Sequence, residues 1–219
     1  MTGSNLTFIS VVERDDGLSN LMVQSIRRFK PDARILIADN GSNPHLAEYG
    51  AELIPNRPTV QGGSNRHAEG LNLLFPMVET EYCVVMDSDA ALVSGDWQPT
   101  HALTAAPKHG TQEGCWHMCF AILRTADFKG IDFSPADGYD VGFRVQHKDW
   151  ELLQFVDTKT GHGRTFDSTI QSDELFLDWK PVAVHLGRGS NLKGKLTKTP
   201  KPLAQQVEEW KTRVKELIK

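Results

Sequence analysis

Cysteine is scarce in this chain, with three cysteines among 219 residues. Three cysteines are too few to suggest a disulfide framework. We therefore expect a reducing compartment, of which the cytoplasm is the simplest. Long apolar runs are missing too, because no stretch approaches the ~20 apolar residues that a membrane span needs. The first five residues are small and polar, which does not predict a signal peptide. These absences favour a soluble cytoplasmic protein.

Two motifs of phosphate and ester chemistry are also absent. The sequence contains no Gly-x-x-x-x-Gly-Lys-Ser/Thr, which excludes a P-loop. It contains no Gly-x-Ser-x-Gly either, which excludes the usual nucleophile turn of α/β hydrolases.

Charge is unevenly distributed along the chain. The net charge is −4, but residues 186–219 contain nine Lys/Arg and three Asp/Glu and carry +6, which leaves −10 on the rest. The basic tail is either a solvated segment or one that faces an acidic partner, such as an anionic glycan or modified DNA.

Strand and helix patterns alternate through the first ninety residues. Apolar, β-branched runs predict strands at 6–12, 34–38, 51–54 and 82–86. Helical spacing predicts helices at 18–29, near 45–49 and after Ser64, which we expect to cap the third helix. This order predicts an α/β fold with a mostly parallel central sheet flanked by helices.

The second half of the chain has weaker patterns. Strands are expected at 116–123 and 182–186, a helix over 141–150 and a terminal helix after residue 202. Glycines at 161 and 163 predict a loop over 159–164.

The central chemical signal is Asp87-Ser88-Asp89, which directly follows a fully apolar strand. Two carboxylates at that position need compensation, and a divalent cation such as Mg²⁺ or Mn²⁺ supplies it. An Asp-x-Asp pair also occurs in turns and helix caps, but its place after a buried strand favours a metal site. A metal held there would stabilise charge on a departing diphosphate.

Four further residues are candidates for the same site, and each has a plainer interpretation. Asp39 ends a strand, where it can hydrogen-bond a base or ribose, or form an Asx turn. Because ligands bind beyond the carboxyl ends of parallel strands, we expect Asp39 to converge with the Asp-x-Asp pair. His185 also ends a strand and can complete a metal shell, or simply pack. Arg66 and Arg188 can clamp phosphates, or be surface cations.

These motifs together resemble family 2 of the inverting GT-A glycosyltransferases. The matching segments occur in the family's order: the first strand and helix, 39–42 (Asp-Asn-Gly-Ser), 62–72, 87–89, 137–144 and 185–187 (His-Leu-Gly). The resemblance implies a Rossmann-like GT-A sheet with a smaller acceptor-side lobe and a C-terminal helix. We predict one domain over residues 1–219: a nucleotide-sugar-binding half over about 1–95, an acceptor-side half over about 96–190 and a basic helical tail over about 191–219.

The resemblance implies a role for each of these positions. Asp39 would hold the nucleotide base, and Arg66 would lie near the base or the diphosphate. Asp87 would face the ribose and the metal, while Asp89 and His185 would bind Mn²⁺ or Mg²⁺ directly.

By the same resemblance, the general base that deprotonates the acceptor would be either Asp137 or Asp140. The family's Glu-Asp pair is replaced here by Asp137-Gly138, so both assignments stay open. The plainer interpretation of Asp140 is a helix N-terminal carboxylate that pairs with Arg144.

The implied activity is a metal-dependent transfer of sugar, with inversion, from a nucleotide-diphosphate sugar to an acceptor hydroxyl. A UDP-sugar is the expected donor, and the acceptor is a glycan, a lipid-linked glycan or a modified nucleic acid. The alternatives are a sugar-nucleotide nucleotidyltransferase, a haloacid dehalogenase-type phosphohydrolase and a sugar-binding module without activity. The phosphohydrolase carries its Asp-x-Asp on the first strand, whereas three strand units precede the pair here.

Overall fold

The computed structural model describes residues 5–13, 17–41, 43–108, 113–136, 139–157, 172–186 and 202–219. Its strands are β1 (Leu6–Val12), β2 (Arg34–Asp39), β3 (Glu52–Pro55), β4 (Tyr82–Met86), β5 (Ala90–Leu92), β6 (Leu103–Pro107), β7 (Trp116–Arg124), β8 (Trp150–Leu152), β9 (Gln154–Asp157), β10 (Asp173–Leu177) and β11 (Lys180–His185). Its α-helices are α1 (Leu18–Phe29), α2 (Gly63–Leu74) and α3 (Leu203–Leu217). Short 3-10 helices are η1 (Pro44–Tyr49), η2 (Phe75–Met77) and η4 (Thr125–Phe128).

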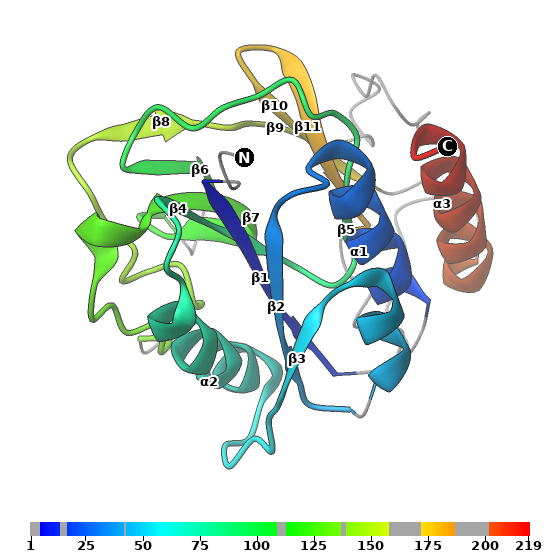
Figure 1. Cartoon of the computed structure of the whole chain (residues 1–219). Coiled ribbons are helices and arrows are strands. Elements are labelled where there is room, and N and C mark those ends of the chain that lie inside the picture. The colour runs from blue at the N-terminus through cyan, green and yellow to red at the C-terminus, as the bar shows by residue number, and fades with distance from the viewer. Residues whose placement is uncertain are drawn as a thin grey trace.

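A seven-stranded sheet with the order β3-β2-β1-β4-β7-β6-β8 forms the centre of the molecule (Figure 1). The first four strands in this order pair in parallel, and so do β6 and β8. Only β7 runs the other way, antiparallel to both β4 and β6. The predicted, mostly parallel α/β sheet is therefore confirmed, and all its strands except β7 end at one edge, called here the carboxyl edge.

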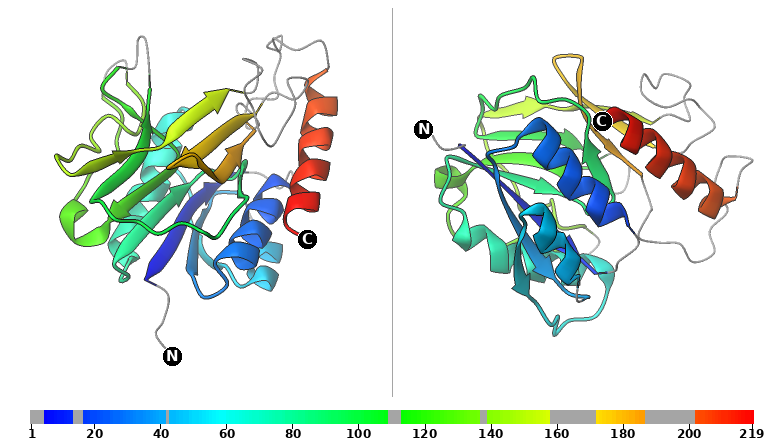
Figure 2. Two further views of the ribbon diagram at one scale, coloured as in Figure 1. Left: turned by 90° about the horizontal axis from the view of Figure 1, so that it is seen from above. Right: turned by 45° about the vertical axis from the view of Figure 1, so that its right-hand side comes forward.

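Helices cover both faces of this sheet because successive side chains on a strand point to opposite faces. Phe8 of β1 packs with Met22 of α1 on one face. Its neighbour Ile9 packs with Leu71 of α2 on the other face. All four side chains are almost fully buried, and each such burial contributes about 1.5–3 kcal/mol. Figure 2 shows the sheet lying between the two helices.

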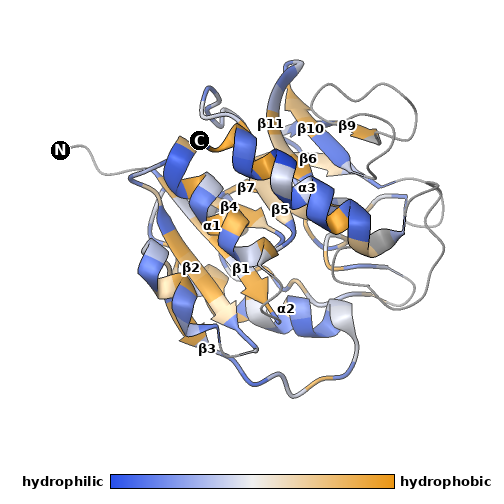
Figure 3. Ribbon diagram, turned by 90° about the vertical axis from the view of Figure 1, so that its right-hand side faces the viewer, coloured by the Kyte–Doolittle hydropathy of each residue, from blue (hydrophilic) through white to orange (hydrophobic). Residues whose placement is uncertain are grey.

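A second, antiparallel sheet has the order β5-β11-β10-β9, and three residues, 87–89, separate the end of β4 from the start of β5. The C-terminal helix α3 packs against this sheet and against α1 (Figure 3). The sequence predicts the strand at β11 and the helix α3, but not β5, β9 or β10. Within the described ranges, no helix combines the length and apolar character that crossing a membrane requires.

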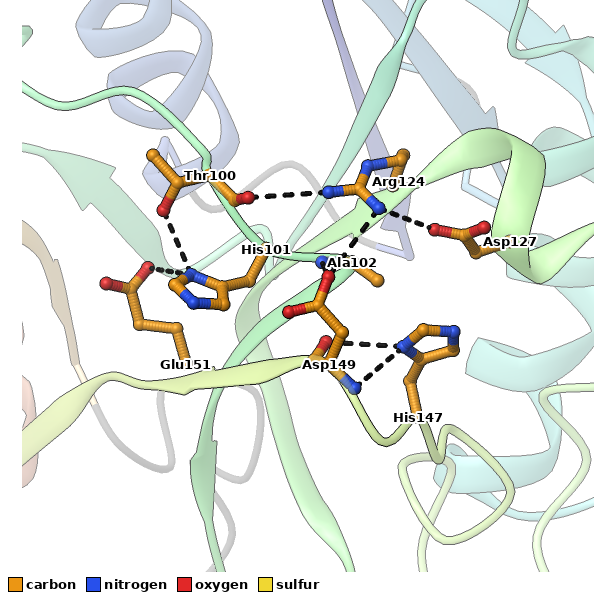
Figure 4. Close-up of polar contacts among 8 residues, drawn as sticks. All are labelled: Thr100, His101, Ala102, Arg124, Asp127, His147, Asp149 and Glu151. Carbon is orange, nitrogen blue, oxygen red and sulfur yellow. Dashed lines mark hydrogen bonds and ion pairs between the residues drawn. The ribbon is translucent and has the colours of Figure 1, made fainter.

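A cluster of polar side chains lies at the opposite edge of the central sheet, where the loops that precede β6 and β8 meet (Figure 4). The carboxylate of Asp149 accepts a hydrogen bond from the backbone N–H of Ala102 at 3.0 Å. Arg124 lies 3.0 Å from the carboxylate of Asp127 and 3.6 Å from that of Asp149. In the register of β7 with β4, Arg124 lies opposite Tyr82, the first residue of β4. The cluster is therefore remote from the carboxyl edge.

Two expectations of local structure are wrong. Residues 141–149 form turns and bends rather than a helix, and β8 starts at 150. A Cβ at Gly142 would lie 2.1 Å from the carbonyl oxygen of Trp116, so this backbone packs directly on β7. Ser64 does not cap α2, because the helix begins at Gly63 after Gly62, whose φ of 90° only glycine adopts readily.

Candidate metal centre

Asp87 and Asp89 lie in the turn that joins the two sheets. β4 is buried along its whole length, so the chain leaves the core at Asp87. The backbone N–H of Asp87 donates to the carbonyl of Cys119 on β7 at 3.0 Å, and the N–H of Ala90 donates to the carbonyl of Asp87 at 3.1 Å. These bonds fix the turn. The Asp89 side chain is 8% exposed and that of Asp87 is 28% exposed, so Asp87 is the more open of the two carboxylates.

His185 reaches the same turn from the end of β11. β11 pairs antiparallel with β5, and the register puts His185 opposite Ala90, next to Asp89. Its Nε2 atom lies 3.2 Å from Oδ1 of Asp89 and 3.8 Å from Oδ2 of Asp87. One ligand atom from each of the three residues lies within 4.8 Å of the other two. The structure thus brings together the three residues that the sequence predicts as metal ligands.

Asp173 holds the other ring nitrogen of His185. Nδ1 of His185 lies 3.0 Å from Oδ2 of Asp173, the first residue of β10. A carboxylate at Nδ1 fixes the orientation of the ring and directs Nε2 toward the paired aspartates, as is usual for histidines that bind metals. The sequence analysis misses Asp173, because only the pairing of β10 with β11 puts it opposite His185.

The charges in this turn favour the presence of a cation. Burial raises the pKa of Asp87. The neighbouring Asp89 raises it further, whereas His67 and His185 lower it. Burial by itself would lower the pKa of His185, but Asp89, Cys119 and Asp173 together outweigh burial and raise that pKa well above its ordinary value. A proton or a metal ion therefore relieves the repulsion between the two carboxylates.

The donor set fits Mn²⁺ or Mg²⁺. Carboxylate oxygens suit both ions, and an imidazole nitrogen is a better ligand for Mn²⁺ than for Mg²⁺. Three protein ligands leave positions for phosphate oxygens and water. Among the described residues, these three form the one His/Cys/Asp/Glu group with such geometry.

The first turns of α2 face this centre. His67, which the sequence analysis does not identify, places Nε2 at 3.5 Å from Oδ1 of Asp87. The predicted residue Arg66 places Nη1 at 3.6 Å from the carboxylate of Glu13, just past the end of β1. The buried Nε of Arg66 has no hydrogen-bond partner within the described chain. The side chain as a whole is 41% exposed, so its Nη atoms are open to an anionic group at this edge.

Asp39 lies at the same carboxyl edge, at the end of β2 and two strands away from β4. Its carboxylate accepts hydrogen bonds from the backbone N–H groups of Gly41 (3.1 Å) and Asn43 (2.8 Å) and from the Asn43 side chain (2.7 Å). These contacts form the Asx-type turn that the sequence offered as the plainer interpretation. Oδ1 accepts two of these bonds and Oδ2 accepts one, so Oδ2 retains capacity to accept one further bond, which a nucleotide could supply.

Asp140 belongs to a neighbouring ion pair. Its Oδ2 lies 2.6 Å from Nζ of Lys108, and its Oδ1 accepts the backbone N–H of Val141 at 2.8 Å. Burial would raise the pKa of Asp140, but Lys108 and these hydrogen bonds lower it to about 2. The sequence analysis misses Lys108. Two other predicted site residues, Asp137 and Arg188, lie outside the described residues.

No protein-family model matches the chain, and no curated protein matches it. Among solved structures, the glycosyltransferase GlyE of Streptococcus pneumoniae TIGR4 is similar over 96% of this chain and 64% of its own, with a TM-score of 0.50 and 10% identity. TarS of S. aureus is similar over 68% of this chain and 35% of its own, with a TM-score of 0.47 and 10% identity.

The mannosyltransferase PcManGT of Pyrobaculum calidifontis, solved with GDP-Man and Mn²⁺, is similar over 57% of this chain and 45% of its own, with a TM-score of 0.42 and 14% identity. The chain spans less than two thirds of the length of each of these three structures.

The likeness to GlyE concerns the fold, and any activity has to be argued from the site. The chain has the GT-A α/β fold, with a candidate Asp-Asp-His metal centre at the carboxyl edge of its central sheet.

Proposed function

We propose that this protein is a metal-dependent glycosyltransferase that uses a nucleotide-diphosphate sugar as its donor. The observation that carries the proposal is the gathering of Asp87, Asp89 and His185 within 4.8 Å at the carboxyl edge of a GT-A sheet. Ligands of open α/β sheets bind at that edge. The fold alone would not support the proposal, because the same sheet hosts several chemistries.

In this proposal Asp87, Asp89 and His185 hold Mn²⁺ or Mg²⁺. When bound, the ion neutralises the negative charge that develops on the diphosphate as the sugar leaves. Asp173 keeps Nε2 of His185 directed at the ion, since its carboxylate lies on the opposite ring nitrogen at 3.0 Å. His67 would bring a donor to the same site through its contact with Asp87.

The nucleotide would lie along the carboxyl edge between β2 and β4. We propose that Asp39 hydrogen-bonds the base or ribose, that Asp87 also faces the ribose, and that Arg66 contacts the base or diphosphate. The exposure of the Arg66 side chain, 41%, supports this, because its Nη atoms lie at this edge beside Glu13. Arg188 is a second proposed phosphate contact. A UDP-sugar is the first donor to test.

The reaction would be a single displacement with inversion at the sugar. The acceptor oxygen forms a bond to the anomeric carbon, the bond from that carbon to the diphosphate oxygen breaks, and the acceptor proton passes to a carboxylate of the protein. Asp137 and Asp140 are the two proposed bases. A carboxyl group with a pKa of about 2 is a weak base, so Asp140 would need Lys108 to move away from it first.

The acceptor would carry a hydroxyl group on a glycan, a lipid-linked glycan or a modified nucleic acid. The net charge of +6 over residues 186–219 supports an anionic acceptor. Binding to such a polyanion should weaken steeply as the salt concentration rises, whereas a neutral glycan should bind independently of salt.

A thermal-shift panel tests the proposal. UDP, GDP, CDP and ADP are added with and without Mn²⁺, and the unfolding midpoint should rise most for one nucleoside diphosphate in the presence of Mn²⁺. The corresponding nucleotide sugar should then be hydrolysed slowly, or transferred when an acceptor is supplied. A midpoint that no combination raises would contradict the proposal. Release of pyrophosphate from a nucleoside triphosphate and a sugar phosphate would indicate a nucleotidyltransferase instead.

A further inference from the structure

The C-terminal helix α3 lies directly behind the candidate metal centre. Its buried side chains form one cluster with residues of β5, β11 and α1; the members are Leu18, Leu21, Ala91, Val184, Leu186, Val207, Trp210 and Val214. Val184 and Leu186 flank His185 in the sequence, and neighbouring residues on an extended chain point to opposite faces. α3 therefore packs against one face of the end of β11, and His185 points to the other face.

A chain of hydrogen bonds joins α3 to His185. The indole N–H of Trp210 donates to the hydroxyl of Ser172 at 3.2 Å, and that hydroxyl donates to the backbone carbonyl of His185 at 3.0 Å. Trp210 and Ser172 are both fully buried. A hydroxyl has a single proton to donate, so the indole N–H sets the direction in which Ser172 donates. Burial makes the loss of either bond costly.

Ser172 and its neighbour Asp173 hold His185 at two points. Ser172 binds the backbone carbonyl, and Asp173 binds Nδ1 of the ring at 3.0 Å. The next backbone N–H, that of Leu186, donates to the carbonyl of Asp89 at 3.0 Å. The backbone of His185 is therefore fixed to both the second sheet and the Asp-x-Asp turn.

We propose that α3 is a positioning element of the metal centre, and that Trp210 acts through Ser172 to set the place of His185. The inference rests on the proposed function, because it assigns His185 to a metal. Metal ligands depend on partners that orient them, and loss of one such partner typically weakens metal binding 10–100-fold. Trp210 and Ser172 would not touch the ion or the substrate.

Mn²⁺ binding to the 219-residue chain, measured by titration calorimetry without any nucleotide, tests this inference. The variants are Ser172→Ala and Trp210→Phe, which remove the hydroxyl and the indole N–H. The control is Val214→Ala, which loosens the same buried cluster without altering the hydrogen bonds. Circular dichroism at the titration temperature verifies that every variant is folded.

We expect Mn²⁺ to bind about tenfold more weakly to Ser172→Ala and about threefold more weakly to Trp210→Phe. Val214→Ala should unfold at a lower temperature yet bind Mn²⁺ within about twofold of the unmodified protein. Unchanged Mn²⁺ affinity in both hydrogen-bond variants would overturn the inference while the metal centre itself stands. An equal loss in Val214→Ala would overturn it too, because packing alone would then explain the effect. If the unmodified chain binds no Mn²⁺ at all, the metal centre and this inference fail together.

Discussion

Lys108 and Asp140 form an ion pair with Nζ and Oδ2 only 2.6 Å apart. The pair joins the end of β6 to the loop that precedes residue 141, and Ser64 of α2 adds a hydrogen bond to the same carboxylate. Three segments that are distant in sequence thus meet at one carboxyl group, close enough to Asp87 for its charge to raise the pKa of that residue.

Replacing Asp140 should alter the acid stability of the protein. The pKa of Asp140 is lower in the folded protein, at about 2, than its ordinary value of 3.8. Its contribution is therefore fully present above about pH 4 and is lost as the pH falls toward 2. Because the side chain is 35% exposed, screening by water limits that contribution to roughly 1 kcal/mol. Urea titrations of Asp140→Asn at pH 7 and pH 3 should show a loss that shrinks at the lower pH. A loss of equal size at both values would contradict the assignment.

Replacing Asp89 should abolish metal-dependent ligand binding. Asp89→Asn retains the shape of the side chain but removes a charge from the centre, so a nucleoside diphosphate with Mn²⁺ should no longer raise the unfolding midpoint. Any sugar-transfer activity should fall at least about a hundredfold. Asp127→Asn is the matched control, because Asp127 pairs with Arg124 in the remote cluster of Figure 4. Equal nucleotide responses in the two variants would count against a metal at Asp89.

Removal of the His67 side chain should weaken Mn²⁺ binding without abolishing it. His67→Ala deletes the contact at 3.5 Å to Asp87 but none of the three proposed ligands. We expect Mn²⁺ affinity, measured by titration calorimetry, to fall about threefold to tenfold. His101→Ala, in the remote cluster beside Glu151, should leave that affinity unchanged. Equal affinities for His67→Ala and the unmodified protein would exclude His67 from the site.

The contact of α2 with the sheet predicts opposite results for two glycines of this helix. A Cβ at Gly70 would lie 2.5 Å from Cγ2 of Val11, whereas a Cβ at Gly63 would meet nothing within 4 Å. Gly70→Ala should therefore destabilise the protein by about 1–3 kcal/mol in urea unfolding. Gly63→Ala should be neutral or stabilising by up to about 1 kcal/mol, because alanine favours helices. A stabilised Gly70→Ala would show that α2 lies farther from β1 than described.

Patterns of burial made the first half of the chain predictable. β1 and β4 are buried along their whole lengths, so their apolar runs mark their bounds, and α1 has one apolar stripe. In the second half of the chain, contacts between segments distant in sequence determine the secondary structure, and local patterns do not reveal them. Val141 and Val145 are both buried at helical spacing, yet the backbone turns there because Gly142 packs on Trp116. β9 and β10 are short strands that depend on pairing with one another.

The candidate site was predictable where one residue carries its own signal. Asp87 and Asp89 follow a buried strand, and His185 ends another, so each is visible in the sequence. His67 and Asp173 were not predictable. Only the packing of α2 places His67 beside Asp87, and only the register of β10 places Asp173 opposite His185.

The proposed ligands come from both ends of a long stretch of chain. Asp89 precedes β5 and His185 ends β11, so a bound cation would reinforce, much as a disulfide does, the closure of a loop of about a hundred residues that the pairing of β5 with β11 already makes. Depletion of the ion would then leave that closure to the pairing of β5 with β11 alone. Limited proteolysis in the presence of a chelator should accordingly cut first between β5 and β11, while the paired strands β1 and β2 stay intact.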